Sequence, residues 1–326
     1  MPDLPWTCCR ILPWIAAQPA KSAKPPFLKK YVELPIQIFW RRDMSSSPSK
    51  ALQPVESAWK PDKLPPFPAV ALKALNLMAG TDKSLLELCN LIRSDPAFST
   101  AVLKIANSPL VAFSKNLTSV LQASMLLGFQ RLRSVVITVG LKAYLKEPFT
   151  PLLQSCWRHS VACAIVAEHA ASWSGFDKDF AYTAGIMHDI GRVAMASVLP
   201  EPYARVVETG ADLPHDLLQR EWEFCGIDHC QAGRSLVTAW NLPEAFLEVT
   251  SSHHHPVTRV RGPASVLRLS CLLADSLGFG VVQYRAPQSY RETISEFPET
   301  ARNLFPAEAK DLASEIQDEI KVIETV

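Results

Sequence analysis

No hydrophobic run in this sequence is long enough to cross a bilayer. A membrane-spanning helix needs roughly 20 consecutive, mainly apolar residues, but the apolar stretches 134–141 and 160–167 each end at a charged residue. The apolar segment 11–17 follows a single basic residue and contains Pro13, which makes it a poor secretory signal. We therefore expect neither a membrane span nor export.

The sequence also has almost no net charge. Its 33 Lys and Arg residues offset 32 Asp and Glu residues, so overall charge favours neither nucleic acid nor an anionic membrane as a partner. Residues 1–63 do hold ten basic residues against five acidic ones, and such an arm can attach to phosphates. Its aromatic residues lack the interleaved basic pattern of a base-stacking surface, so we expect no nucleic-acid partner.

No Cys-x-x-Cys pair occurs among the eight cysteines. Paired cysteines at that spacing are typical of structural zinc sites, so the spacing does not predict one. Six of the cysteines lie in apolar helical patterns, where we expect buried free thiols of a packed core and a reducing, cytoplasmic location. These six are Cys89, Cys156, Cys163, Cys225, Cys230 and Cys271.

Two further absences are alternating strand patterns and a glycine-rich phosphate loop. From Leu64 onward, apolar residues recur at helical spacing, with Asp95-Pro96 predicting a helix start and Gly128 a helix end. The sequence therefore predicts an all-α fold of two packed helical subdomains. The expected helices include residues 69–79, 129–145, 152–173, 178–188, 190–199, 214–224, 229–240, 243–253 and 263–277.

The prolines are uneven, because 13 of the 26 fall in the first 68 residues. We expect residues 1–63 to form a disordered or loosely ordered leader, of which 1–43 are an upstream extension if Met44 is the start. Residues 64–280 form the helical module, and 281–326 form a C-terminal helical tail. Within the module, the first lobe is expected over 64–150 and the second over 151–280.

All eight histidines lie between His159 and His255. The strongest motif is His188-Asp189, where a helix breaks before Gly191. Adjacent imidazole and carboxylate groups can bind one divalent cation together, and the carboxylate can bridge to a second. The alternative is that both side chains only cap helix ends.

Further potential ligands surround this pair in the sequence. Imidazoles and carboxylates of separate helices can meet at one metal site. Arg192, a few residues after the pair, is placed to bind a phosphate oxygen; the alternative is that it lies on a solvated face. Cys156 and Cys163 share a helix face with His159 but are expected to be packing residues, and neither His169 nor His215 is expected in the site. The predicted metal ligands are His159, His188, Asp189, His229, His254, His255 and Asp275, with His253 as a further candidate of the triple histidine.

Residues 64 to about 280 resemble an HDOD domain, the HD-related output domain of bacterial signalling proteins. The resemblance implies an all-helical, two-lobed regulatory module that binds a signalling protein or a small nucleotide-type ligand. The matching motifs are Leu64-Pro65-Pro66-Phe67-Pro68, Ser94-Asp95-Pro96, Lys104-Ile105-Ala106-Asn107-Ser108, the segment 123–128, Trp157-Arg158-His159-Ser160, the segment 184–191 and Trp240-Asn241-Leu242-Pro243.

More distantly, the sequence is similar to the HD and HD-GYP metal-dependent phosphohydrolases, which implies Fe, Mn or Zn at the ligand positions above. Three departures disfavour hydrolysis. Ser155 stands where the HD-GYP pattern has a glutamate ligand, no Gly-Tyr-Pro loop follows Pro256, and Arg192 stands where HD enzymes commonly have lysine. The sequence therefore favours a regulatory module, with a nucleotide or cyclic-dinucleotide phosphohydrolase as the alternative.

Overall fold

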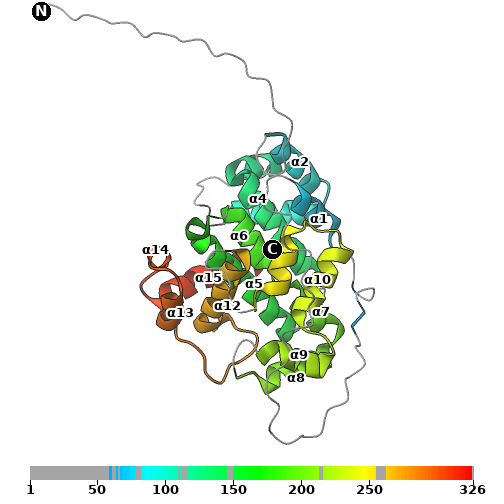
Figure 1. Ribbon diagram of the computed structural model, residues 1–326. Helices are drawn as coiled ribbons and strands as arrows, with labels where there is room; N and C mark the ends of the chain where they lie inside the picture. The colour runs from blue at the N-terminus through cyan, green and yellow to red at the C-terminus, as the bar shows by residue number, and fades with distance from the viewer. Residues whose placement is uncertain are drawn as a thin grey trace, which may run out of the picture. The chain divides into compact units, whose positions relative to one another are not determined.

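The computed structural model describes residues 59–60, 64, 67–77, 82–108, 111, 117–144, 150–175, 177–212, 216–254 and 262–324. The chain divides into two compact units, residues 1–51 and 52–326, and every described residue belongs to the second. The described ranges are helical and contain no strand (Figure 1), which confirms the predicted all-α class. Met44 and the leader up to residue 58 lie outside them. No helix in these ranges has the length and apolar character that a membrane span requires.

The first four helices pack together, with α1, α2 and α3 each in contact with α4. Asp95 caps α3 as predicted, because its carboxylate accepts hydrogen bonds from the N–H groups of Ala97 and Phe98. Gly128 has φ +72°, a left-handed conformation that glycine adopts without strain, so the predicted helix end is a kink within α4. The bounds are α1 Ala69–Asn76, α2 Asp82–Arg93, α3 Pro96–Ala106 and α4 Val120–Tyr144.

The second group of helices surrounds α5, which packs against α6, α7 and α12. Every side chain from 159 to 167 is buried, as expected of a helix that is apolar on all sides. The sequence analysis missed α8, whose first turn contains Pro200 and Pro202; proline is tolerated there because those N–H groups have no partner within the helix. The bounds are α5 Pro151–Ser174, α6 Lys178–Met187, α7 Ile190–Val198, α8 Pro200–Thr209, α9 Asp216–Cys225, α10 His229–Ala239, α11 Ala245–Ser252 and α12 Pro263–Ala274.

Two glycines allow the helices around the His188-Asp189 turn to approach closely. A Cβ atom on Gly185 would lie 2.3 Å from the Cα of Ala164, and one on Gly191 would lie 2.0 Å from the backbone oxygen of His229. No side chain larger than hydrogen fits at either position. The glycines therefore hold α6 against α5 and α7 against α10, and this contact brings His229 next to Asp189.

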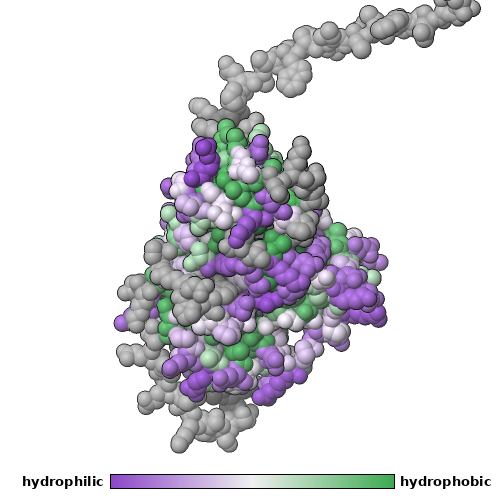
Figure 2. Space-filling view, turned by 180° about the vertical axis from the view of Figure 1, so that it is seen from behind, coloured by the Kyte–Doolittle hydropathy of each residue, from purple (hydrophilic) through white to green (hydrophobic). Residues whose placement is uncertain are grey.

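The C-terminal elements pack against the second group (Figure 1). The last helix, α15, buries Leu312, Ile316, Ile320 and Ile323, which recur at the spacing of one helix face. This face contacts α5 and α3. On the view in Figure 2, hydrophilic and hydrophobic side chains are interspersed. The bounds are η3, a π-helix, Asp275–Phe279, then α13 Tyr290–Glu296, α14 Glu299–Arg302 and α15 Ala309–Glu324.

Candidate metal centre

Asp189 lies at the centre of four converging imidazoles. Its Oδ1 is 3.4 Å from Nε2 of His229 and 3.2 Å from Nε2 of His253. Its Oδ2 is 3.6 Å from Nε2 of His159 and 3.5 Å from Nε2 of His188. Each oxygen of one carboxylate thus faces its own pair of ring nitrogens, supplied by α5, the α6–α7 turn, α10 and the end of α11.

The opposite nitrogen, Nδ1, of each of these rings lies within hydrogen-bond distance of an oxygen. Such a partner holds the proton on Nδ1 and leaves the lone pair of Nε2 directed inward, which is the usual arrangement of metal-bound histidines. The four partners are the backbone oxygens of Phe279 for His159 at 3.1 Å, Gly185 for His188 at 2.7 Å and Val249 for His253 at 2.9 Å, and Glu221 Oε2 for His229 at 2.6 Å.

The Asp189 carboxylate is buried, and neither oxygen makes a well-directed hydrogen bond to a described residue. Buried carboxylates are normally hydrogen-bonded, so the two oxygens are available to a cation. Burial alone would raise the pKa of Asp189, but Arg192, His188 and His229 hold that pKa well below its ordinary value. An ionised carboxylate surrounded by imidazole nitrogens is a donor set that fits a divalent metal ion.

Arg192 is buried beside Asp189 and does not lie on a solvated face. Its Nε is 3.1 Å from Oδ2 of Asp189, and the side chain is only 3% exposed. The exposed alternative considered for this residue is therefore wrong. Its charge is directed to the carboxylate at the centre of the cluster.

Glu221 is a buried member of the site that the sequence analysis missed. Its Oε2 accepts hydrogen bonds from both the backbone N–H and Nδ1 of His229, and its Oε1 accepts one from Tyr203. Glu221 lies on the buried face of α9 between Leu217 and Cys225. A charged residue at i+4 on an otherwise apolar stripe is the signal that would have identified it.

We expect Glu221→Gln to lower metal affinity by about 10- to 100-fold while the fold is retained. Residues that orient a histidine ligand typically contribute that much, and the amide keeps the size of the side chain but loses the charge paired with His229. Isothermal titration of chelator-treated protein with Zn²⁺ measures the change. Glu223→Gln, on the same helix and in an ion pair with Arg220, is the control. Equal affinities for both variants would contradict the orienting role.

The remaining predicted ligands occupy different places. A ring nitrogen of His254 lies with donor atoms of Asp189, His229 and His253 in a group spanning at most 4.8 Å. Asp275 approaches His159 from the outer side, with its Oδ1 3.4 Å from Nδ1. Its carboxyl, whose pKa burial raises to about 6, is therefore outside that group.

Three histidines are left, and the predicted ligand His255 is one of them. His169 is partly exposed and pairs with Glu315 of α15 at 2.9 Å, as expected of a polar position outside the site. His215 and His255 lie outside the described residues.

A small cavity of about 50 Å³ touches the centre at His253 and His254, and Asp275 also lines it. Next to it is a pocket of about 540 Å³, formed by α12 and the segment 280–288. Four residues line both, so the pocket adjoins the cavity at Arg268, Leu272, Asp275 and Tyr284. A small ligand in the larger pocket would lie next to the metal centre.

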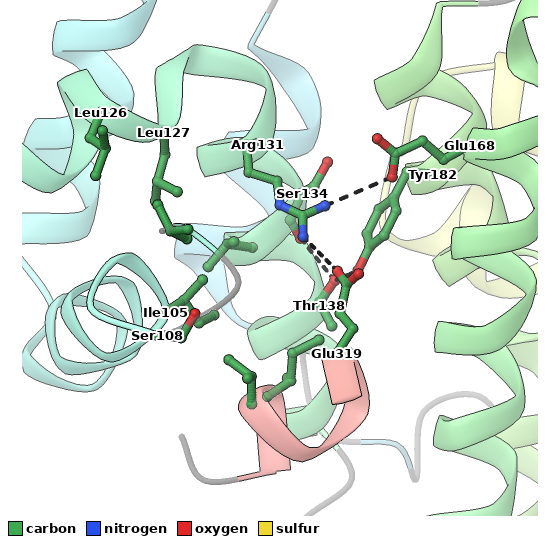
Figure 3. Close-up of a pocket in the computed structure, with 14 residues that line it drawn as sticks. Ile105, Ser108, Leu126, Leu127, Arg131, Ser134, Thr138, Glu168, Tyr182 and Glu319 are labelled. Carbon is green, nitrogen blue, oxygen red and sulfur yellow. Dashed lines mark hydrogen bonds and ion pairs between the residues drawn. The ribbon is translucent and has the colours of Figure 1, made fainter. Parts of the chain in front are cut away.

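Another cavity, of about 380 Å³, lies between α3, α4, α6 and α15 (Figure 3). Its Arg131 is paired with Glu319 at 2.8 Å and with Glu168 at 3.8 Å. Two carboxylates therefore offset the one cation, and the rest of the lining combines aliphatic side chains with the hydroxyl groups of Ser108, Ser134, Thr138 and Tyr182. Among the described residues that line this cavity, no cluster of potential metal ligands occurs, so the centre at Asp189 is the candidate site.

The charges of the centre predict a pH optimum for the stability of the metal-free protein. Burial lowers the pKa of His188, but the charge of Asp189 and the contact with Cys271 together raise it to about 9. The contribution of His188 to the free energy of unfolding is fully present below the pKa of about 6.5 that the residue has in the unfolded chain. It is lost as the pH rises through the folded-state pKa of about 9. Burial lowers the pKa of both His253 and His254, so their contribution is lost as the pH falls below about 6.5.

We therefore expect the free energy of unfolding of chelator-treated protein to be greatest near pH 6.5. The loss by about pH 9.5 is expected to be smaller than the roughly 3 kcal/mol that the raised pKa of His188 alone would give, because the pKa of the neighbouring Cys271 thiol lies well below its ordinary value and contributes with the opposite sign. Urea denaturation across this range measures the profile. Constant or rising stability between pH 6.5 and 9.5 would contradict the charge arrangement described.

The sequence matches the HDOD domain model over residues 64–256. The chain belongs to the HDOD family. This confirms the resemblance found in the sequence. An uncharacterized protein of Treponema pallidum (strain Nichols) is 26% identical over 199 residues, which are 60% of this HDOD chain but only 38% of that relative. The chain thus spans well under half the length of this relative.

Solved structures share the fold at low sequence identity. An HDOD domain protein of unknown function from Geobacter sulfurreducens is 22% identical with a TM-score of 0.62, covering 80% of this chain and 91% of that one. A proposed phosphohydrolase from Shewanella amazonensis is 21% identical with a TM-score of 0.58, covering 81% and 95%. A proposed signal transduction protein from Marinobacter aquaeolei is 21% identical with a TM-score of 0.60, covering 80% and 59%. At these identities, the likenesses show the fold alone.

Proposed function

We propose that this HDOD protein is a regulatory output module of bacterial signalling that binds a divalent metal ion, Fe, Mn or Zn, in its second lobe. The observation that carries the proposal is the convergence of four imidazole Nε2 atoms on one buried carboxylate, each ring being oriented through its Nδ1. His229, His253 and His254 with Asp189 would hold the ion. Because these ligands come from α10, the end of α11 and the α6–α7 turn, the ion would fasten three elements together.

The enclosure of the centre supports regulation over catalysis. Asp189, His229 and His253 are each at most 1% exposed, and the adjoining cavity of about 50 Å³ has room for a water molecule or two. Arg192 is engaged with Asp189 and is not directed at a substrate. The larger pocket lined by Arg268 and Tyr284 would bind the small nucleotide-type ligand that the module senses, and a signalling protein would be the partner.

A metal-dependent phosphohydrolase is the second candidate, and Arg268 is the observation that favours it. This partly buried arginine lines both cavities and has no ion pair with any described residue, so its guanidinium is available to a phosphate group. A bound metal ion would activate water and offset charge on the phosphoryl oxygens. Arg268 would hold the ester in the larger pocket.

Metal content and hydrolysis, measured together, test these proposals. Untagged protein purified without chelator is analysed by mass spectrometry for Fe, Mn and Zn, beside Asp189→Asn, and both are incubated with bis(p-nitrophenyl) phosphate and with cyclic dinucleotides. We expect the metal content of Asp189→Asn to be lower than that of the wild type by one ion per chain, and no metal-dependent hydrolysis. Hydrolysis that needs the metal and is abolished in the variant would favour the phosphohydrolase. Folded protein that binds none of the three metals would overturn both proposals.

A further inference from the structure

Two cysteines lie beside the imidazoles that face Oδ2 of Asp189. The Sγ of Cys163, one turn after His159 on α5, is 3.4 Å from Nε2 of His159. The Sγ of Cys271, on α12, is 3.2 Å from Nε2 of His188. The four donor atoms all lie within 4.8 Å of one another, and all four side chains are buried. Cys163 is buried in the hydrophobic core, as expected of a packing residue, and its Sγ in addition lies beside a ring nitrogen.

We propose that His159, Cys163, His188 and Cys271 form a separate metal site of two imidazoles and two thiolates that takes Zn²⁺. Tetrahedral zinc has bonds of about 2.3 Å to sulfur and about 2.0–2.1 Å to nitrogen, so a nitrogen and a sulfur on one ion lie roughly 3.5 Å apart. The two nitrogen–sulfur distances, 3.4 and 3.2 Å, are close to that separation. Small movements of the side chains would complete the tetrahedron.

The orientation of both rings supports this assignment. The Nδ1 of His159 lies beside the backbone oxygen of Phe279, and that of His188 beside the backbone oxygen of Gly185. The Nε2 lone pairs are therefore directed toward the sulfur atoms. Cys156 provides a contrast, since it is equally buried on α5, two turns before Cys163, but belongs to neither group of potential ligands.

Asp189 separates this site from the group of ligands that its own carboxylate forms with His229, His253 and His254. Its Oδ2 faces His159 and His188, whereas its Oδ1 faces His229 and His253. The sulfur atoms of Cys163 and Cys271 lie on the Oδ2 side, where thiolates select zinc over harder ions. On the Oδ1 side, the Sγ of Cys230 is farther from its nearest imidazole, 3.7 Å from Nε2 of His229, and Cys230 belongs to neither group of potential ligands. Two thiolates offset the charge of Zn²⁺, so the ion adds no net charge beside the buried Arg192–Asp189 pair.

The donor set also predicts the role of the site. Zinc with four protein ligands has no position left for water and is structural, whereas catalytic zinc retains an open position. The ion would tie α5, the α6–α7 turn and α12 together. The inference rests on the proposed metal binding of this lobe and adds the thiolates as ligands.

Cobalt spectroscopy tests the thiolate ligands, because Co²⁺ bound to sulfur has an intense near-ultraviolet charge-transfer absorption that nitrogen and oxygen ligands do not give. Chelator-treated full-length protein is titrated anaerobically with Co²⁺, and bound Zn²⁺ is counted separately for each variant. We expect the band in the wild type, about half its intensity in Cys163→Ser and in Cys271→Ser, and its loss together with one Zn²⁺ per chain in the double variant. Cys156→Ser should match the wild type.

The wild-type spectrum decides the proposal even if a cysteine variant fails to fold. Cobalt that binds without a charge-transfer band would overturn the thiolate site and leave the proposed histidine and aspartate centre intact. A band that persists in the double variant would also overturn the assignment to these two cysteines. Folded protein that binds neither Co²⁺ nor Zn²⁺ would overturn both the thiolate site and the proposed metal binding.

Discussion

Asp189→Ala is expected to destabilise the metal-free protein by about 3–5 kcal/mol. The carboxylate is the ion-pair partner of Arg192, and both side chains are buried. Removing one partner of a buried pair leaves an uncompensated charge in the core, and such changes have effects of that size. Urea denaturation of chelator-treated wild type and variant measures the difference in the free energy of unfolding.

Replacing both charges should recover much of this loss. In Asp189→Ala with Arg192→Met, no unpaired charge remains in the core, and substitution of a buried pair by apolar residues is often close to neutral. The surface pair of Asp212 and Arg285, which are 56% and 71% exposed at 2.9 Å, is the control. Asp212→Ala should change stability by less than about 1 kcal/mol. If Asp189→Ala is no more harmful than Asp212→Ala, the Arg192 charge is not paired as described.

The sequence predicts those parts of the fold that depend on local chemistry. Asp95-Pro96 starts α3 as expected because capping requires only neighbouring residues. His188 and Asp189 fall in a helix break because the pattern of the two flanking helices is interrupted there. α8 is missed, since Pro200 and Pro202 suggest a loop when their places in a first helical turn are unknown.

The candidate site is less predictable, because its members meet across long stretches of chain. His188 and Cys271 are 83 residues apart, and helical spacing identifies the face of α12 that is buried but not the residue it meets. The sequence also does not show which of the two ring nitrogens of a histidine a carboxylate approaches. Asp275 therefore matches a ligand position in sequence, yet its carboxylate lies beside Nδ1 of His159, away from Asp189.

The second large effect is expected from a single methyl group, in Gly191→Ala. The added Cβ would lie 2.0 Å from the backbone oxygen of His229, 2.3 Å from the nitrogen of Gly233 and 2.9 Å from its Cα. All three are backbone atoms that no side-chain rotation can move, so α7 and α10 must separate. We expect a loss of more than about 3 kcal/mol, measured as the shift in the urea unfolding midpoint, and weaker metal binding because His229 moves away from Asp189.

Two other glycines make the measurement selective, even if Gly191→Ala yields no folded protein. At Gly233, an added Cβ would lie 3.2 Å from the Cβ of Thr250. This overlap is much smaller than those at Gly191 and is relieved by a slight shift of α11, so Gly233→Ala should cause a smaller loss of about 1 kcal/mol. At Gly262, the backbone is extended and the nearest atom is a Glu248 oxygen at 3.9 Å, so Gly262→Ala should stay within about 0.5 kcal/mol of wild type. If Gly191→Ala unfolds at the same midpoint as Gly262→Ala, α7 and α10 are not in the close contact that places His229 beside Asp189.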